Sequence, residues 1–178
     1  MTLAEFRRTY PTTTFTVSGG KPFTYRYYQN PLAEATLVLL TGGIGLSDLF
    51  YKHFARFAGD FSVLTFDYQI QFADNGEFAD AVAELLHCLK EKAWLVGQSL
   101  GGVVAQIIAA RHPEVVEGLV LSNTCSLSGS MSETGYQDLM KMIESQRKFK
   151  KWLAFLPFPL IKRTMRWAVM KKKTDGFT

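Results

Sequence analysis

A serine flanked by glycines is the part of the sequence whose residue types and spacing best suit chemistry. The segment Gly97-Gln98-Ser99-Leu100-Gly101 follows a short apolar run at 93–96 and precedes a long apolar stretch. A serine on a sharp turn from strand to helix presents its hydroxyl above the sheet, and small neighbours two positions away avoid a Cβ clash. Ser99 is therefore a candidate nucleophile for attack on a carbonyl carbon. The alternative is a glycine-rich turn whose serine only caps the helix.

A second glycine-rich segment, Thr41-Gly42-Gly43-Ile44-Gly45, follows the apolar run at 35–40. Acyl transfer requires backbone N–H groups aimed at the oxyanion that develops on the substrate. Leu100, directly after the serine, is expected to supply one of these donors, and the 41–45 loop the other. A flexible turn with no such role is the alternative interpretation of this loop.

These segments need a sheet to position them, and the hydrophobic pattern predicts one. Thr12–Val17 and Phe23–Tyr28 alternate around a turn and predict an antiparallel hairpin. Four further apolar runs predict buried strands, and the segments between them have helical spacing. The strands are expected at 35–40, 62–66, 93–96 and 119–122, and the helices at 47–57, 78–89 and 99–111. The pattern indicates an α/β fold whose sheet is mostly parallel, with helices on both faces.

The order of these elements resembles the α/β-hydrolase superfamily, from the hairpin to residue 125. The resemblance implies that Ser99 is the nucleophile, that Gly43 and Leu100 form the oxyanion hole, and that substrate lies above the carboxyl ends of the strands. Gly42, Ile44 and Gln98 are then expected to contact the substrate. The family orders its triad as serine, acid and histidine, with the last two placed after further strands.

Two segments depart from the family pattern. The oxyanion loop begins with Thr41, where many relatives have histidine, and the segment YQIQFADNGEF after Asp67 lacks the Arg-Gly-x-Gly run of esterase-like members. The short connection after Asp67 resembles maspardin-like members of the family. The substrate class therefore does not follow from the resemblance.

No histidine is placed to activate Ser99. His112 alone follows it, 13 residues later, which is about 20 Å along the same helix. His53 and His87 fall in earlier helices, where His87 is expected to be partly buried, and Asp67 is expected to form structural hydrogen bonds. We expect a chain that stops about two strand-plus-helix units short of the full fold and is a poor enzyme alone.

Charge divides the chain in two. Residues 1–140 carry 9 Lys and Arg against 14 Asp and Glu, whereas residues 141–178 carry 11 against 2. We expect a partial hydrolase core at 1–128 and an incomplete, basic helical cap at 129–178, divided by Pro157 and Pro159. Large apolar side chains there would face the acyl site or the missing strands: Trp152, Phe155, Phe158, Leu160, Trp167 and Met170. A basic amphipathic helix on a membrane surface or partner is the alternative, and exposed apolar residues there could drive dimerisation.

The remaining composition excludes several classes. Cys88 and Cys125 stand alone, so we expect two small buried thiols, no disulfide framework and no metal. The N-terminus lacks a secretory signal and no apolar run could span a bilayer, so a soluble cytoplasmic protein is expected. No cofactor or nucleic-acid partner is predicted.

Three functional hypotheses remain open. The first is a serine hydrolase for a small ester-like molecule, acting as an esterase, lactonase or C–C bond hydrolase, of which this chain is a truncated part without acid and histidine. The second is a non-catalytic hydrolase-like binding or scaffold protein. In the third, a partner chain completes the sheet and the triad.

Overall fold

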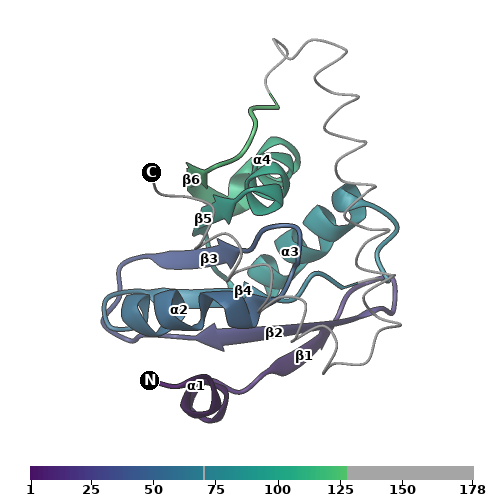
Figure 1. Ribbon diagram of the computed structural model, residues 1–178. Coiled ribbons are helices and arrows are strands. Elements are labelled where there is room, and N and C mark those ends of the chain that lie inside the picture. The colour runs from purple at the N-terminus through teal and green to yellow at the C-terminus, as the bar shows by residue number, and fades with distance from the viewer. Residues whose placement is uncertain (70, 128–178) are drawn as a thin grey trace, which may run out of the picture. The chain divides into compact units, whose positions relative to one another are not determined.

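A six-stranded sheet with the order β1-β2-β4-β3-β5-β6 organises the chain (Figure 1). The computed structural model describes residues 1–69 and 71–127. The strands of this part are β1 (Thr13–Thr16), β2 (Pro22–Tyr28), β3 (Thr36–Leu40), β4 (Ser62–Phe66), β5 (Ala93–Gln98) and β6 (Val116–Ser122). β3 to β6 pair in parallel, whereas β1 and β2 form an antiparallel hairpin that joins the sheet along β4. The predicted α/β fold with its N-terminal hairpin is therefore confirmed.

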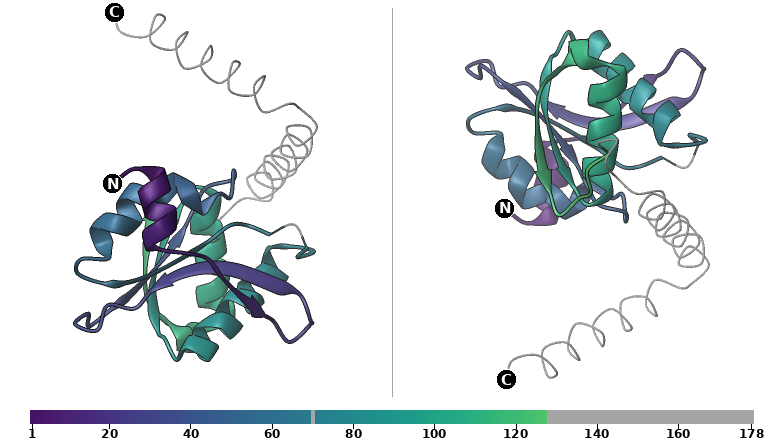
Figure 2. Two further views of the ribbon diagram at one scale, coloured as in Figure 1. Left: turned by 90° about the horizontal axis from the view of Figure 1, so that it is seen from below. Right: turned by 90° about the horizontal axis from the view of Figure 1, so that it is seen from above.

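Helices cover both faces of the sheet (Figure 2). They are α1 (Leu3–Thr9), the 3₁₀ helix η1 (Ser47–Phe50), α2 (Tyr51–Phe57), α3 (Asn75–Leu89), α4 (Leu100–Arg111) and the 3₁₀ helix η2 (Pro113–Val115). In the left view of Figure 2, α1 and α2 lie on one side of the sheet and α3 and α4 on the other. No helix among the described residues is both long and apolar enough to cross a membrane.

Alternating side chains of the central strand supply two cores. Val38 and Leu40 of β3 join the cluster beneath α3 and α4, while Leu37 and Leu39 join the cluster beneath α1 and α2. Successive side chains of a strand point to opposite faces, so a strand covered on both sides must be apolar throughout. β3 and β4 are buried along their whole length, as their sequences predict. The central strands thus hold the carboxyl-terminal edge of the sheet rigidly in place.

β6 differs from its prediction as a buried strand. It lies last in the strand order and pairs with β5 alone among the described strands. Leu119, Val120 and Leu121 are 36%, 48% and 42% exposed, and Trp94 on β5 is 41% exposed. A continuous apolar run predicts burial on both faces, but an edge position leaves such side chains in contact with solvent. The prediction of burial is therefore wrong for this strand.

Two smaller predictions are also wrong. His87, expected to be partly buried, is exposed because it shares a helix face with Asp80 and Glu84, and Cys88, expected to be buried, is exposed near the end of α3. Cys125 is half-buried. The expected basic cap at 129–178 lies outside the described residues.

A charged cluster joins the end of α4 to α3. Arg111 donates two hydrogen bonds to the Asp80 carboxylate, at 2.8 and 2.7 Å, and His112 Nε2 lies 2.7 Å from Asp80 Oδ1. The hydrogen bonds from Arg111 hold the pKa of Asp80 below its ordinary value. A carboxyl whose folded-state pKa is lowered stabilises the fold above its unfolded-state pKa, and this contribution disappears as pH falls through the folded-state pKa.

Asp80→Asn is therefore expected to lower the free energy of unfolding by about 1 kcal/mol near pH 7, since the pair is partly exposed. The deficit should be smaller at about pH 3 than near pH 7, because the contribution is lost as pH falls toward the lowered pKa of Asp80. Urea unfolding at both pH values measures it. Asp60→Asn is the matched control, because it breaks the more exposed Arg56–Asp60 pair and should cost less than about 0.5 kcal/mol. An equal deficit for Asp80→Asn at both pH values would contradict the electrostatic origin.

Candidate active site

Ser99 occupies a strained turn between β5 and α4. Its φ of 54° and ψ of −119° lie where residues with a Cβ rarely occur, and its side chain makes no capping hydrogen bond to the helix. The capping interpretation of this serine therefore finds no support in the geometry. Backbone strain of this kind costs about 1–3 kcal/mol and is concentrated at functional sites.

Neighbouring glycines make this turn sterically possible. A Cβ on Gly97 would lie 2.6 Å from the Gly101 carbonyl oxygen, and one on Gly102 would lie 2.5 Å from Thr124 Cγ2. A Cβ on Gly101 would overlap the carbonyl of Leu40 and lie 2.6 Å from that of Thr41. The first turn of α4 thus rests directly on the backbone at the end of β3, which only glycine allows.

Hydrogen bonds to the backbone of Ser99 hold the turn in place. Ser99 N donates to the Ser122 carbonyl at 2.9 Å, and Thr124 Oγ1 donates to the Ser99 carbonyl at 2.7 Å. Gly102 N reaches the same carbonyl at 3.0 Å. These bonds fix the backbone of Ser99, while its hydroxyl takes part in none of them.

The glycine-rich loop after β3 lies against Ser99. A Cβ on Gly42 would lie 2.8 Å from Gln98 Oε1 and 3.5 Å from Ser99 Cβ. Gly45 N donates to the Gly42 carbonyl at 2.8 Å, which closes a tight turn around Gly43 and Ile44. The structure therefore brings together Gly42, Gln98 and Ser99, and leaves the Ile44 side chain 56% exposed beside them.

The amino terminus of α4 also lies beside Ser99. Leu100 is the first residue of the helix, and the first amides of a helix have no partner in a preceding turn. The helix dipole adds partial positive charge there, which favours an anion. Leu100 and Gly42 of the 41–45 loop thus both lie beside Ser99.

The histidines lie elsewhere. His112 ends α4 and faces Asp80 and Glu114, His87 lies 3.8 Å from Glu114, and His53 is on the exposed face of α2 beside Phe50. In residues 1–69 and 71–127, none of them forms a hydrogen bond with Ser99.

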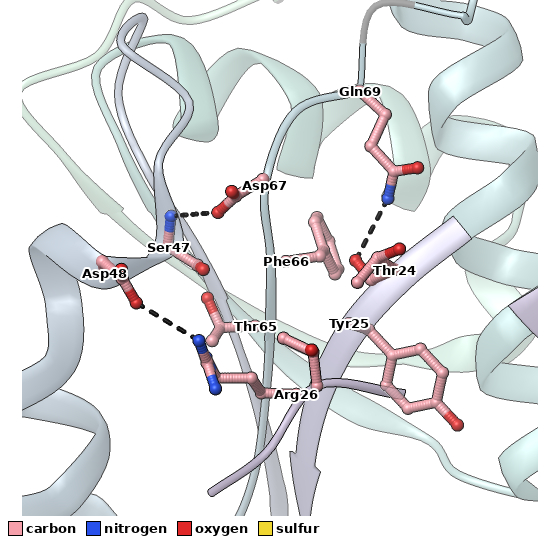
Figure 3. A pocket seen from close by; sticks show the side chains of 10 residues that line it. Thr24, Tyr25, Arg26, Ser47, Asp48, Thr65, Phe66, Asp67 and Gln69 are labelled. Atoms are coloured by element: carbon pink, nitrogen blue, oxygen red, sulfur yellow. Dashed lines mark hydrogen bonds and ion pairs between the residues drawn. The ribbon is translucent and has the colours of Figure 1, made fainter. Parts of the chain in front are cut away.

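Asp67, at the end of β4, has a structural partner. Its Oδ1 accepts a hydrogen bond from Ser47 N at 2.7 Å (Figure 3), which ties the start of η1 to the sheet. Asp67 also borders a hollow of about 260 Å³ over β2 and β4. The hollow is lined by Thr12, Thr24, Tyr25, Arg26, Ser47, Asp48, Thr65, Phe66, Asp67 and Gln69, and thus by no residue of the Ser99 turn.

A buried guanidinium distinguishes this hollow. Arg26 lies 3.4 Å from Asp48 Oδ1 and donates to the Tyr10 carbonyl, and Asp48 also pairs with Arg7. Asp48 of η1 thus pairs with an arginine of α1 and an arginine of β2, which links these three elements. No motif in the sequence indicated this cluster. The described residues contain no group of His, Cys, Asp or Glu that could hold a metal ion.

The fold and this turn place the chain in a known class. The family model of the alpha/beta hydrolase fold matches residues 70–167, which is more than half of the chain. The protein belongs to the alpha/beta hydrolase family.

Individual relatives are more distant. The chain is 28% identical over 123 residues to the "Putative carbamate hydrolase RutD" of Agrobacterium fabrum, covering 63% of this chain and 47% of the relative. A hydrolase from Pseudomonas aeruginosa superposes with a TM-score of 0.60 at 22% identity, covering 86% of this chain and 62% of that structure. The esterase RhEst1 from Rhodococcus gives 0.56 at 26% identity, covering 64% and 46%. The chain spans about half the length of the curated relatives it matches.

Gly101→Ala should destabilise the fold by more than about 3 kcal/mol, because its methyl group would overlap backbone atoms that cannot move aside. Gly19→Ala is the matched control: an added Cβ there meets nothing within 4 Å, so its effect should stay within about 0.5 kcal/mol. Thermal and urea unfolding measure both variants. Similar stabilities for the two would contradict the close contact between α4 and β3.

Strain at Ser99 can be measured by substitution. Ser99→Gly should be more stable than Ser99→Ala by about 1 kcal/mol, since glycine adopts positive φ without strain and alanine does not. Urea unfolding of the pair gives the difference. If the alanine variant is the more stable, Ser99 is not strained.

Proposed function

We propose that this chain supplies the nucleophile and oxyanion hole of a serine hydrolase, with Ser99 as the nucleophile and Gly43 and Leu100 as backbone donors. The observation that carries the proposal is the strained, positive-φ backbone of Ser99 where β5 meets α4. A serine without a chemical role gains nothing from this conformation, because glycine would adopt it at lower cost.

The surroundings of Ser99 support acyl transfer. The amino terminus of α4 and the 41–45 loop both lie beside Ser99, which supports a role for their amides in stabilising negative charge on a substrate carbonyl oxygen. Gly42, Ile44 and Gln98 form the adjoining substrate surface in this proposal. The exposed Ile44 offers an apolar contact and the half-buried Gln98 a carboxamide, which suits a carbonyl compound with both apolar and polar parts.

The reaction begins when Ser99 Oγ bonds to the carbonyl carbon and its proton passes to a base. The bond to the leaving group then breaks as that group takes the proton, and water cleaves the acyl-serine to restore the hydroxyl. Ester, lactone and C–C bond substrates remain the proposed classes. The name of the Agrobacterium relative adds carbamates, whose carbonyl carbon is attacked in the same way.

In this proposal the base comes from outside this chain's own histidines, since the partners that the structure gives all three are residues other than Ser99. In this proposal a histidine and an acid on further polypeptide complete the site. A serine that lacks its base keeps only the residual reactivity given by the oxyanion hole and binding. This chain alone is therefore expected to react slowly.

Exogenous imidazole should partly replace the missing base. With a fluorophosphonate probe, imidazole is expected to raise the labelling rate of Ser99 by about tenfold or more, and the rate should increase with pH as imidazole becomes neutral, between about pH 6 and 8. Mass spectrometry of the labelled peptide identifies the site. Ser99→Ala should abolish the labelling, whereas Ser122→Ala, which removes a nearby exposed serine hydroxyl, should not.

If folded protein shows no labelling of Ser99 even with imidazole, the nucleophile assignment is wrong. That outcome favours the alternative of a non-catalytic binding or scaffold protein.

A further inference from the structure

The residue after Asp67 contacts the glycine-rich loop at both of its ends. The Tyr68 hydroxyl donates a 2.5 Å hydrogen bond to the Thr41 carbonyl, where the loop begins. Tyr68 N donates to the Gly45 carbonyl at 2.8 Å, where the tight turn closes. Gly42, Gly43 and Ile44 lie between these two points. Tyr68 therefore holds the turn by a hydrogen bond at each of its ends.

Packing leaves Tyr68 little freedom. A Cβ on Gly45 would lie 2.7 Å from Tyr68 Cβ, and Gly45 has a φ of 65°, so the two backbones approach as only glycine permits. On its other side the Tyr68 ring meets Phe78 of α3 edge to face at 5.2 Å. The Tyr68 side chain thus packs against both the loop and α3, and in this position its hydroxyl bonds to Thr41.

The bonded carbonyl is itself part of the contact with α4. A Cβ on Gly101 would lie 2.6 Å from the Thr41 oxygen, and Gly42 follows directly beside Ser99. A shift of Thr41 therefore moves the loop relative to both Ser99 and the amino terminus of α4. Because a displacement of about 1 Å in such a site can cost about 100-fold in rate, the hold on Thr41 matters for reactivity.

We propose that Tyr68 is a positioning residue, which sets the reactivity of Ser99 by holding the Thr41–Gly45 loop in its donor geometry. This inference rests on the proposed function of Ser99. Tyr68 touches no reacting atom and acts through the Thr41 carbonyl and the Gly45 turn. Burial also raises the pKa of Tyr68, which keeps its hydroxyl a donor throughout the neutral range.

The test compares Tyr68→Phe with Tyr27→Phe. Phenylalanine at 68 keeps the ring against Phe78 and removes the hydroxyl that bonds to Thr41. Tyr27 is a matched control, since its partly buried hydroxyl bonds to Glu91 near the opposite edge of the sheet, far from Ser99. Both variants lose a partly buried tyrosine hydroxyl that takes part in hydrogen bonds, so unfolding measurements should show comparable, modest losses of stability.

Imidazole-assisted labelling of Ser99 gives the first measurement. Tyr68→Phe is expected to lower the maximal labelling rate about tenfold, with the half-saturating probe concentration unchanged, whereas Tyr27→Phe should label as fast as the parent protein. Equal maximal rates for Tyr68→Phe and the parent would overturn the proposal, as would equal losses in both variants.

Hydrogen exchange gives a second measurement that does not need a reactive serine. The Gly45 amide, bonded to Gly42, should exchange about tenfold faster in Tyr68→Phe than in the parent or in Tyr27→Phe. Unchanged exchange would show that Tyr68 does not hold the loop, whether or not Ser99 reacts. Ser99 could fail to label in every variant while the Gly45 amide exchanges faster only in Tyr68→Phe. That result would contradict the proposed function of Ser99 but support the conclusion that Tyr68 holds the loop.

Discussion

Contact between two stretches of backbone, the first turn of α4 and the end of β3, determines much of what surrounds Ser99. Gly101 lies against the carbonyls of Leu40 and Thr41, so the axis of α4 is fixed by main-chain atoms. Side chains can change rotamer, whereas backbone atoms in a buried parallel strand have no alternative position. Glycine at position 101 therefore sets the distance between α4 and the sheet, and with it the position of the first amides of the helix.

Three parallel strands end at the edge of the sheet where this contact lies. Because β3, β4 and β5 are parallel, their carboxyl ends lie side by side, and each contributes one segment to the site. β5 contributes the turn at Ser99, β3 the loop from Thr41, and β4 the pair Asp67 and Tyr68 that ties this loop and the start of η1 to the sheet. The site is thus a product of the sheet's topology as much as of any single motif.

Local pattern was sufficient to predict most of this fold. The strand Ser62–Phe66 was predicted to the residue, and the glycine spacing around Ser99 and the loop at 41–45 indicated a site that the structure assembles in one place. α1 was missed, although Thr2 and Glu5 form a capping box that its spacing could have revealed.

Other features depend on long-range packing, which no local pattern records. The exposure of β6 follows from its place in the strand order, and that of His87 from the side of α3 on which it lies. No local pattern distinguishes Tyr68, because its hydroxyl bonds to the Thr41 carbonyl, 27 residues away in the sequence. The Arg26–Asp48 pair likewise joins two segments that share no motif.

The bonds that hold the Ser99 backbone come from residues made later in synthesis. Its amide is bound by Ser122 and its carbonyl by Thr124, about 25 residues downstream. A chain emerging from the ribosome therefore completes β5 and α4 before it can fix the turn between them. Parallel pairing with β6 is a non-local event, which is slow compared with helix formation. The backbone of the proposed nucleophile is therefore fixed only once β6 has paired with β5.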